Sequence, residues 1–212
     1  MTHHPEPEQA HYDVHRVTEP EPRYLDQIHA LLGEMVQEGA ALGWVDPPTR
    51  SDVGELLADL IQGADFDDAC LAVAERVSEN GDDTQVVGFA YWTRREGATE
   101  QPHADIARVA VSSHARGGGL GRRLVETLVD YARKVGVEIL TLDCRGNNHA
   151  AMHVYERLGF KEYGRIPDFV AIDNERWDNV YFSLDLRGPE EHEDLVRHGD
   201  TPRGAGASEL RS

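Results

Sequence analysis

The sequence predicts an α/β or α+β domain in which short strands and helices alternate. Two observations lead to this class. The spacing of apolar residues switches repeatedly between the period of two that strands show and the period of about 3.6 that helices show. Of the 212 residues, 40% are hydrophobic, enough for one sizeable core and requiring no second domain. We therefore expect a single domain over residues 12–187, with mobile tails at 1–11 and 188–212.

Local patterns define the individual elements. Leu25 and Ile28 begin a series of apolar residues at helical spacing, and Thr49 or Ser51 can cap the next helix. The stretch 79–83 consists of turn-forming residues, so the strands on either side are expected to form a hairpin. The expected elements are a strand at 12–18, helices at 25–36 and 53–61, strands at 69–75, 85–93 and 105–111, a helix at 119–135 closed by Gly136, a strand at 137–144, a helix at 148–158, and strands at 160–166 and 177–186.

Charge and composition exclude several classes of protein. The chain has 21 Lys and Arg against 39 Asp and Glu, a formal charge of −18, whereas nucleic-acid binding needs a basic face. No apolar run approaches the roughly 20 residues of a membrane span, and the N-terminus lacks the features of a signal peptide. We expect a cytoplasmic protein that binds neither nucleic acid nor membranes. Cys70 and Cys144 form no metal-ligand pattern, and no metal site is expected.

The glycine-rich stretch 111–123, between an expected strand and an expected helix, is the most informative segment. Glycines let consecutive backbone N–H groups point into one concavity, and the helix N-terminus adds the positive end of its dipole. In this acidic chain, no Asp or Glu lies between Asp105 and Glu126. Four arginines do: Arg108, Arg116, Arg122 and Arg123. The stretch therefore predicts a phosphate-bearing ligand.

The spacing within this stretch excludes two common phosphate-binding motifs. A Walker P-loop ends in Gly-Lys-Ser/Thr, whereas this stretch has Gly121-Arg122-Arg123 and no hydroxyl for magnesium. A Rossmann fingerprint would need Gly or Ala where Leu124 stands. A nucleotide triphosphatase or a dinucleotide-binding protein is therefore not expected. Taken alone, the stretch is also compatible with a plain tight turn.

The remaining pattern, Arg116-x-x-Gly119-x-Gly121, resembles the pyrophosphate-binding motif of the GCN5-related N-acetyltransferase (GNAT) family. Residues 104–111 resemble the family's central strand and residues 148–160 its last motif, in the family's order and distances. The resemblance implies a GNAT fold, with a single mixed, mostly antiparallel sheet that is flanked by helices and splayed at its central strands. It also implies that acetyl-CoA serves as the acyl donor, without a metal.

The resemblance assigns roles to individual residues. Tyr155 would protonate the leaving thiolate, a role that suits a phenol because it stays uncharged near neutral pH. A backbone amide at Val109 or Val111 would hold the oxyanion. From the residues alone, Tyr155 is equally a core tyrosine on an amphipathic helix. The expected cofactor-binding residues are Val109, Ala110, Val111, Arg116, Gly117, Gly118, Gly119, Leu120, Gly121, Arg122 and Asn148.

Acyl transfer to an amine also requires a base that removes the amine's proton. Asp105, on the expected central strand, resembles in its position the catalytic glutamate of some family members. Asp143, at the end of the next strand, is the second choice. The alternatives are a solvated carboxylate for Asp105 and a carboxylate that binds loop amides for Asp143.

In this family the acceptor lies between the connection of the first two helices, here 39–51, and the loop between the last two strands, here 167–178. Both segments are acidic and aromatic, which suits a cationic amine. Their residues of this kind are Trp44, Asp46, Asp52, Asp168, Phe169, Asp173, Glu175 and Trp177. We expect N-acetylation of a small-molecule primary amine. The alternatives are a protein lysine or N-terminal acetyltransferase and a non-catalytic acyl-CoA-binding regulatory module; a homodimer is compatible with the sequence but not indicated by it.

Overall fold

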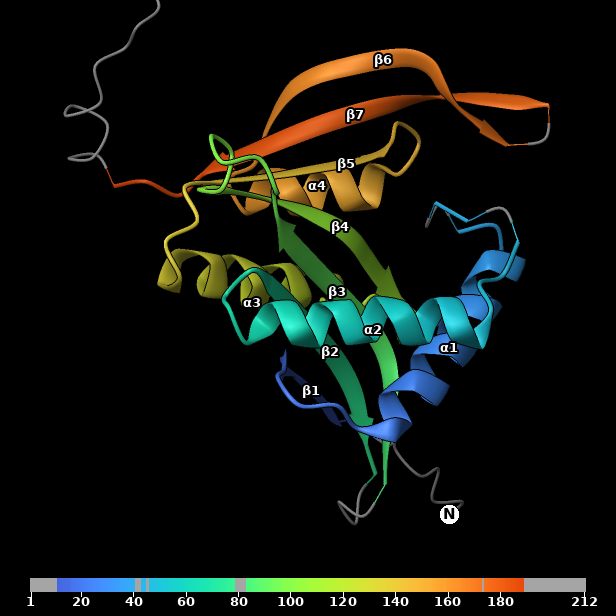
Figure 1. Ribbon diagram of the computed structural model, residues 1–212. Helices are drawn as coiled ribbons and strands as arrows, with labels where there is room; N and C mark the ends of the chain where they lie inside the picture. Colours follow the sequence, from blue (N-terminus) through green and yellow to red (C-terminus); the bar gives the residue numbers. More distant parts are fainter. Residues whose placement is uncertain (1–10, 41–42, 45, 79–82, 173, 189–212) are drawn as a thin grey trace, which may run out of the picture.

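The computed structural model describes residues 11–188, apart from 41–42, 45, 79–82 and 173. Within these residues, seven strands form one sheet with four α-helices on its two faces (Figure 1). The elements are β1 (His11–Val17), α1 (Pro22–Gln37), α2 (Arg50–Ala64), β2 (Ala69–Val77), β3 (Thr84–Arg94), β4 (His103–Val111), a short 3₁₀ helix (Ser113–Ala115), α3 (Leu120–Lys134), β5 (Ile139–Arg145), α4 (His149–Arg157), β6 (Lys161–Ile172) and β7 (Glu175–Asp185).

The strand order is β1-β2-β3-β4-β5-β7-β6, and only the β4–β5 pair is parallel. This central pair is short, because only residues 103–105 of β4 pair with residues 139–141 of β5. Beyond them, β4 continues along β3 and β5 continues along β7. The sheet therefore forks between β4 and β5. The mixed, mostly antiparallel sheet with a splay at its central strands confirms the fold expected from the sequence.

Two hydrophobic cores hold the helices against the sheet. On one face, α1 and α2 pack on β2 and β3 around buried residues such as Ile28 and Phe89. On the other face, α3 and α4 pack on the sheet around residues such as Leu128 and Phe182. The Trp92 indole on β3 also donates a hydrogen bond of 3.1 Å to the Leu128 carbonyl of α3. Helices thus cover both faces of the half of the sheet that is formed by the N-terminal strands.

Local signals in the sequence account for helix ends. Thr49 and Asp52 form a capping box at the start of α2, in which the Thr49 hydroxyl accepts from the Asp52 amide and the Asp52 carboxylate accepts from the Thr49 amide. Of the two predicted caps, Thr49 is therefore the one used. Gly136 follows α3 with a φ of +72°, a left-handed conformation that favours glycine.

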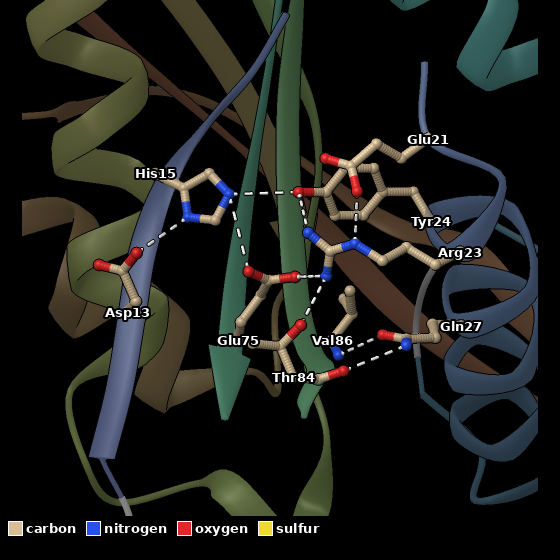
Figure 2. A network of polar contacts seen from close by, with 9 residues as sticks. All are labelled: Asp13, His15, Glu21, Arg23, Tyr24, Gln27, Glu75, Thr84 and Val86. Atoms are coloured by element: carbon tan, nitrogen blue, oxygen red, sulfur yellow. Dashed lines mark hydrogen bonds and ion pairs between the residues drawn. The ribbon is translucent and has the colours of Figure 1, made fainter. Parts of the chain in front are cut away.

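A polar network fastens α1 to the sheet below it (Figure 2). The Arg23 guanidinium donates to the Glu75 carboxylate on β2, to the Thr84 hydroxyl on β3 at 2.7 Å, and to the Glu21 carboxylate at 2.6 Å. It also donates to the Tyr24 hydroxyl at 2.9 Å. Gln27 adds a second link, because its side chain accepts from the Val86 amide and donates to the Thr84 carbonyl. Glu75 is buried, so this network neutralises its charge.

The expected boundaries of the last two strands are wrong. We expected strands at 160–166 and 177–186 with a long loop between them, but β6 runs to Ile172 and β7 starts at Glu175. The pairing shifts register between Ile166 and Val170, so Pro167, which has no N–H, lies at an irregularity of the ladder. Residues 170–172 and 175–177 pair beyond this shift, and the hairpin extends past β5 (Figure 1).

Two further expectations concern regions outside the sheet. The predicted tails fall outside the described residues except for residues 11 and 188, and so does most of the predicted turn at 79–83. In the described part of the chain, no helix is both long and apolar enough to span a membrane.

Candidate active site

The fork between β4 and β5 opens into a cavity of about 580 Å³. Its walls come from β4, from the loop before α3 and the first turn of that helix, from the C-terminal end of α1, and from the β5–α4 connection with α4. The lining residues are Met35, Glu38, Gly39, Ala40, Val109, Val111, Ala115, Arg116, Gly117, Gly119, Leu120, Gly121, Arg122, Arg145, Asn147, Asn148, Ala150, Ala151, Val154 and Tyr155. Most of the sequence-predicted cofactor residues therefore meet around one cavity.

The free edge of β4 presents backbone groups to this fork. The Val111 carbonyl accepts a hydrogen bond of 3.3 Å from Arg116 Nε, and the next amide, that of Ser112, points the other way and donates to Val87 on β3. Because alternate residues of a strand direct their backbone groups to the same side, Val109 also points into the fork. Both residues line the cavity, and they can form hydrogen bonds with an extended ligand there.

The glycine-rich loop has the shape expected of an anion-binding turn. Gly117 and Gly119 have φ values of +89° and +74°, a left-handed conformation that favours glycine, and Gly119 is also the N-cap of α3. Gly118 does not have a positive φ, and a Cβ built on it meets no atom within 4 Å. Nothing within the chain therefore requires glycine at position 118, whereas a ligand lying against the backbone would. This loop fits the pyrophosphate of acetyl-CoA.

Positive charge surrounds this loop. The N-terminus of α3 points its free amides at the turn, and no acidic residue lies in its first turn. The Arg116 side chain is exposed at the cavity wall, and the guanidinium of Arg122 is shared with Glu126 at 2.8 Å. Arg116 is therefore the less neutralised of the two arginines.

Asn148 begins α4 at the cavity wall. Its side-chain oxygen accepts from the Ala151 amide at 3.2 Å, so the residue caps its own helix. This bond occupies the side-chain oxygen, so the amide N–H₂ group of the Asn148 side chain can donate to a ligand. The sequence predicted the position of this residue, but the capping role was not predicted.

Tyr155 combines a buried ring with access to the cavity. Its ring packs against Phe160 and Phe182, with centroids 6.0 and 5.9 Å apart, while the residue lines the cavity. Burial raises the pKa of Tyr155 well above its ordinary value, and Cys144 and the Asp143 carboxylate raise it further. The phenol is therefore protonated throughout the neutral range and can donate a proton to a group in the cavity.

The two candidate bases lie on the same face of the sheet but have different surroundings. Asp105 pairs with Arg95 at 2.9 Å and accepts a hydrogen bond from the Thr141 hydroxyl. In the β4–β5 register Asp105 is opposite Thr141, so it marks the last paired position before the fork. Asp143 follows two residues further along β5, within the fork, and is exposed. Neither carboxylate lines the cavity itself.

Two predicted cofactor residues lie away from the cavity wall. Ala110 is fully buried in the core under α1 and α2, because its side chain points to the opposite face from those of Val109 and Val111. Gly118 is exposed at the tip of the loop. Conversely, the sequence reasoning missed Met35 and Glu38 at the end of α1, and also Arg145 and Asn147, all of which line the cavity. Gly39 and Ala40 line it as well and belong to the segment 39–51, which was expected to contact the acceptor.

The residues that were expected to contact the acceptor have different surroundings in the structure. The Arg108 guanidinium stacks on Trp44, with 4.1 Å between the guanidinium carbon and the ring centroid. The corresponding distance from the Arg145 guanidinium carbon to the Trp177 ring centroid is 5.6 Å. Asp52 serves in the α2 capping box, and Asp173 is outside the described residues. In the part of the chain that the structure describes, no three His, Cys, Asp or Glu side chains stand close enough to hold a metal ion.

Taken together, a forked α/β sheet, a glycine-rich turn before a helix and a protonated phenol in one cavity are the features of a protein that binds an anionic ligand beside a proton donor. The profile described as "Acetyltransferase (GNAT) family" matches residues 34–160. The chain belongs to this family of acyltransferases.

Comparison with known proteins places several acetyltransferases among its relatives. It is 32% identical over 160 residues to the mycothiol acetyltransferase of Rhodococcus jostii, covering 74% of this chain and 47% of that protein. It is 31% identical over 109 residues to an L-amino acid N-acyltransferase of Escherichia coli, covering 51% and 61% of the two chains. The [ribosomal protein bS18]-alanine N-acetyltransferase of Escherichia coli is 35% identical over 83 residues, which cover 39% and 56%.

A solved structure shows the same fold. The Salmonella typhimurium acetyltransferase determined with its cofactor acetyl-CoA superposes with a TM-score of 0.69 at 18% identity, covering 83% of this chain and 94% of that one. The chain spans about half the length of the mycothiol acetyltransferase it matches.

Proposed function

We propose that the protein is an N-acetyltransferase that moves an acetyl group from acetyl-CoA to the primary amine of a small molecule, by direct attack within a ternary complex. One observation carries the proposal. A single cavity is bounded by the anion-binding loop, the free edge of β4 and the Tyr155 phenol. A cofactor phosphate, an extended arm and a leaving group would thus each face a group of suitable chemistry.

Backbone groups and a few side chains would bind acetyl-CoA. The amides of the loop around Gly118 and Gly119 would hold the pyrophosphate, with Arg116 adding charge. The backbone of Val109 and Val111 would pair with the extended pantetheine arm, as a strand pairs with a sheet edge. The amide N–H₂ group of the Asn148 side chain would donate a hydrogen bond to the same arm. The relative whose solved structure holds acetyl-CoA supports this choice of donor.

Three proton transfers accompany the chemical step. Asp105 would accept, directly or through water, the proton whose removal makes the attacking amine neutral. The amine nitrogen then forms a bond to the acyl carbon, and the bond from that carbon to sulfur breaks. Tyr155 would give its proton to the leaving sulfur and would regain one from the nitrogen of the new amide, while a backbone amide at Val109 or Val111 would stabilise the negative charge on the acyl oxygen. The raised pKa of Tyr155 supports this role because the phenol is protonated at the pH of the reaction.

The acceptor class rests on the open face beside the fork and on the relatives. The exposed Asp143 carboxylate gives this face a negative charge that attracts an amine, whereas the charge of Asp105 is shared with Arg95. Two relatives are named for small molecules, mycothiol and an L-amino acid, and one is named for an alanine of ribosomal protein bS18. A protein acceptor is therefore the second candidate, and the test includes peptides for that reason.

The experiment follows free-thiol release from acetyl-CoA over pooled small amines and short peptides. We expect release that depends on an amine pool and falls about a hundredfold to ten-thousandfold in Tyr155→Phe, the usual loss for a general acid. Tyr12→Phe, a tyrosine on β1, is the matched control. Asp105→Asn and Asp143→Asn identify the base, since only the base variant should lose rate at saturating amine. Acetyl-CoA binding without amine-dependent release would overturn the proposal in favour of a sensing role.

A further inference from the structure

The Arg108 side chain is a cation without an anionic partner on the acceptor side of the fork. Its guanidinium lies over the Trp44 ring, and its two terminal nitrogens lie 3.3 and 3.4 Å from the place where a Cβ of Gly43 would be. Its Nε is buried and has no hydrogen-bond partner among the described residues. In the same part of the chain, no carboxylate forms an ion pair with it.

A bulge in β4 directs this side chain to the acceptor side. Tyr91 on β3 pairs with Arg108, but the next residue, Trp92, pairs with Ile106, so Ala107 is an extra residue in β4. Such a bulge reverses the alternation of side chains along the strand. Without it, Arg108 would share the α3 face of the sheet with the buried Ile106. With it, Arg108 points to the face that carries α1 and α2.

The same bulge brings Arg108 and Asp105 to one face. They lie opposite Tyr91 and Thr93, two residues apart on β3, and directly opposed residues point to the same side of a sheet. Two residues of strand measure about 7 Å. Asp143 is on this face as well, because Thr141 pairs with Asp105 and strand residues two apart share a face. This face of the sheet therefore carries the Asp105 carboxylate, which is paired with Arg95, the exposed Asp143 carboxylate on β5, and the Arg108 guanidinium.

A partly buried cation without an anion costs free energy, and this chain does not lack anions. It has 39 Asp and Glu, and partly buried arginines such as Arg23 and Arg95 are paired with carboxylates. Arg16 on the edge strand β1, which lies over the Tyr131 ring, resembles Arg108 in having an Nε without a hydrogen-bond partner among the described residues. Stacking on Trp44 offsets part of the desolvation of Arg108, but no anion among the described residues balances its charge. The planar guanidinium, held against Trp44, is suited to bind a carboxylate through two parallel hydrogen bonds.

From this geometry we infer that Arg108 binds a carboxylate of the acceptor, and that the acceptor is an α-amino acid. The amino group would lie toward Asp105 and Asp143 near the fork, and the adjacent carboxylate would lie on Arg108. This inference deepens the proposed function and rests on it for the identity of the reacting amine. It gives Arg108 the role of a specificity-determining binding residue, distinct from the groups that transfer protons.

The test compares L-amino acids with their amides, which keep the amine and the side chain but lack the carboxylate. For each pair, kcat/KM is measured with acetyl-CoA in the wild type, Arg108→Gln and Arg108→Lys. We expect the wild type to prefer the acid at least tenfold in one or more pairs, and Arg108→Gln to bring that ratio close to one, mainly through KM. Arg108→Lys keeps the charge but not the planar fork, so its ratio should lie between them. Arg50→Gln, which removes an exposed arginine of α2, is the control and should keep the wild-type ratio.

A binding measurement separates this inference from the proposed function. Thermal unfolding of the CoA-loaded protein is followed with each acid and its amide. Stabilisation by the acid alone, lost in Arg108→Gln, supports the carboxylate site even if no amine is acetylated, an outcome in which only the proposed function fails. Acetylation of amides as fast as acids, or an acid preference unchanged in Arg108→Gln, overturns the site and leaves the proposed function standing. Neither turnover nor acid-dependent stabilisation in the wild type overturns both. If Arg108→Gln does not fold, the reduced ratio of Arg108→Lys decides.

Discussion

Arg23 and Arg108 both lie between the sheet and the layer of α1 and α2, yet their surroundings differ completely. Arg23 donates to two carboxylates and two hydroxyls, so that its guanidinium joins α1 to β2 and β3 (Figure 2). The hydrogen bonds to the two carboxylates, that to Glu21 foremost, raise the pKa of Arg23 above its ordinary value. Arg108 has an aromatic ring beneath it and no anion among the described residues.

The difference separates groups that maintain the fold from groups that are available to a ligand. The donors of Arg23 are satisfied within the chain, and removing it leaves the buried Glu75 carboxylate without compensation. The donors of Arg108 have no such use, and removing it leaves nothing uncompensated. The same reasoning distinguishes Gly136, which the end of α3 requires, from Gly118, which nothing in the chain requires.

The largest expected effect on stability comes from breaking the satisfied network. Arg23→Met should lower the free energy of unfolding by about 2–3 kcal/mol, less than for a fully buried pair because the Arg23 side chain is 34% exposed. Urea denaturation measures the loss, and acetyl transfer per folded molecule should not change. Arg50→Met removes an exposed ion pair with Asp26 and should cost less than about 1 kcal/mol. Equal losses in the two variants would contradict the role given to the buried carboxylate.

The glycine pair extends the comparison to the backbone. Gly118→Val should raise the KM for acetyl-CoA about tenfold, corresponding to about 1.4 kcal/mol, because a branched side chain fills the space over the loop. Its stability should change little, since its backbone conformation suits any residue. Gly136→Ala, the matched control, should leave that KM unchanged and lower stability by about 1 kcal/mol because of its positive φ. Steady-state kinetics and denaturation should therefore show a change in KM only for Gly118→Val and a loss of stability only for Gly136→Ala. An unchanged KM in Gly118→Val would contradict the assignment of the loop as the pyrophosphate site.

These two glycines also show what the sequence could predict. The order of strands and helices, the stop at Gly136, the cap at Thr49 and the loop at 116–121 were all visible because each depends on residues close together in the chain. The sequence therefore located the glycine-rich turn that lines one end of the cavity. The loop's resemblance to a family supplied the rest of that end, including Tyr155.

The features that sequence reasoning missed depend on pairing between distant segments. The extra residue Ala107 in β4 exists only relative to the register of β3, and it alone brings Arg108 and Asp105 to one face. The length of β6 was missed because its residues are almost all exposed, so no alternation of apolar and polar residues marks the strand. The wall formed by the end of α1 likewise requires knowledge of how that helix crosses the sheet.

A smaller effect tests Arg108 from the side of stability. Arg108→Met keeps an unbranched side chain over Trp44 and removes only a cation without an in-chain anion, so the free energy of unfolding should stay within about 0.5 kcal/mol of the wild type. Urea denaturation beside Arg23→Met provides the direct comparison. A loss as large as that of Arg23→Met would mean that Arg108 serves the fold by holding the connection at Gly43 and Trp44.

The smallest expected effect concerns Tyr155, whose ring belongs to the core and whose hydroxyl belongs to the site. Burial disfavours the charged phenolate, so the pKa of Tyr155 lies above the ordinary value of about 10 and the proton remains available on the alkaline side. At saturating acetyl-CoA and amine, kcat should therefore show no fall between pH 7 and about 9.5. A fall with a midpoint below pH 9 that disappears from the residual activity of Tyr155→Phe would contradict this. It would mean that the hydroxyl is stabilised as phenolate in the complex and that its proton is lost too early for it to serve as the acid.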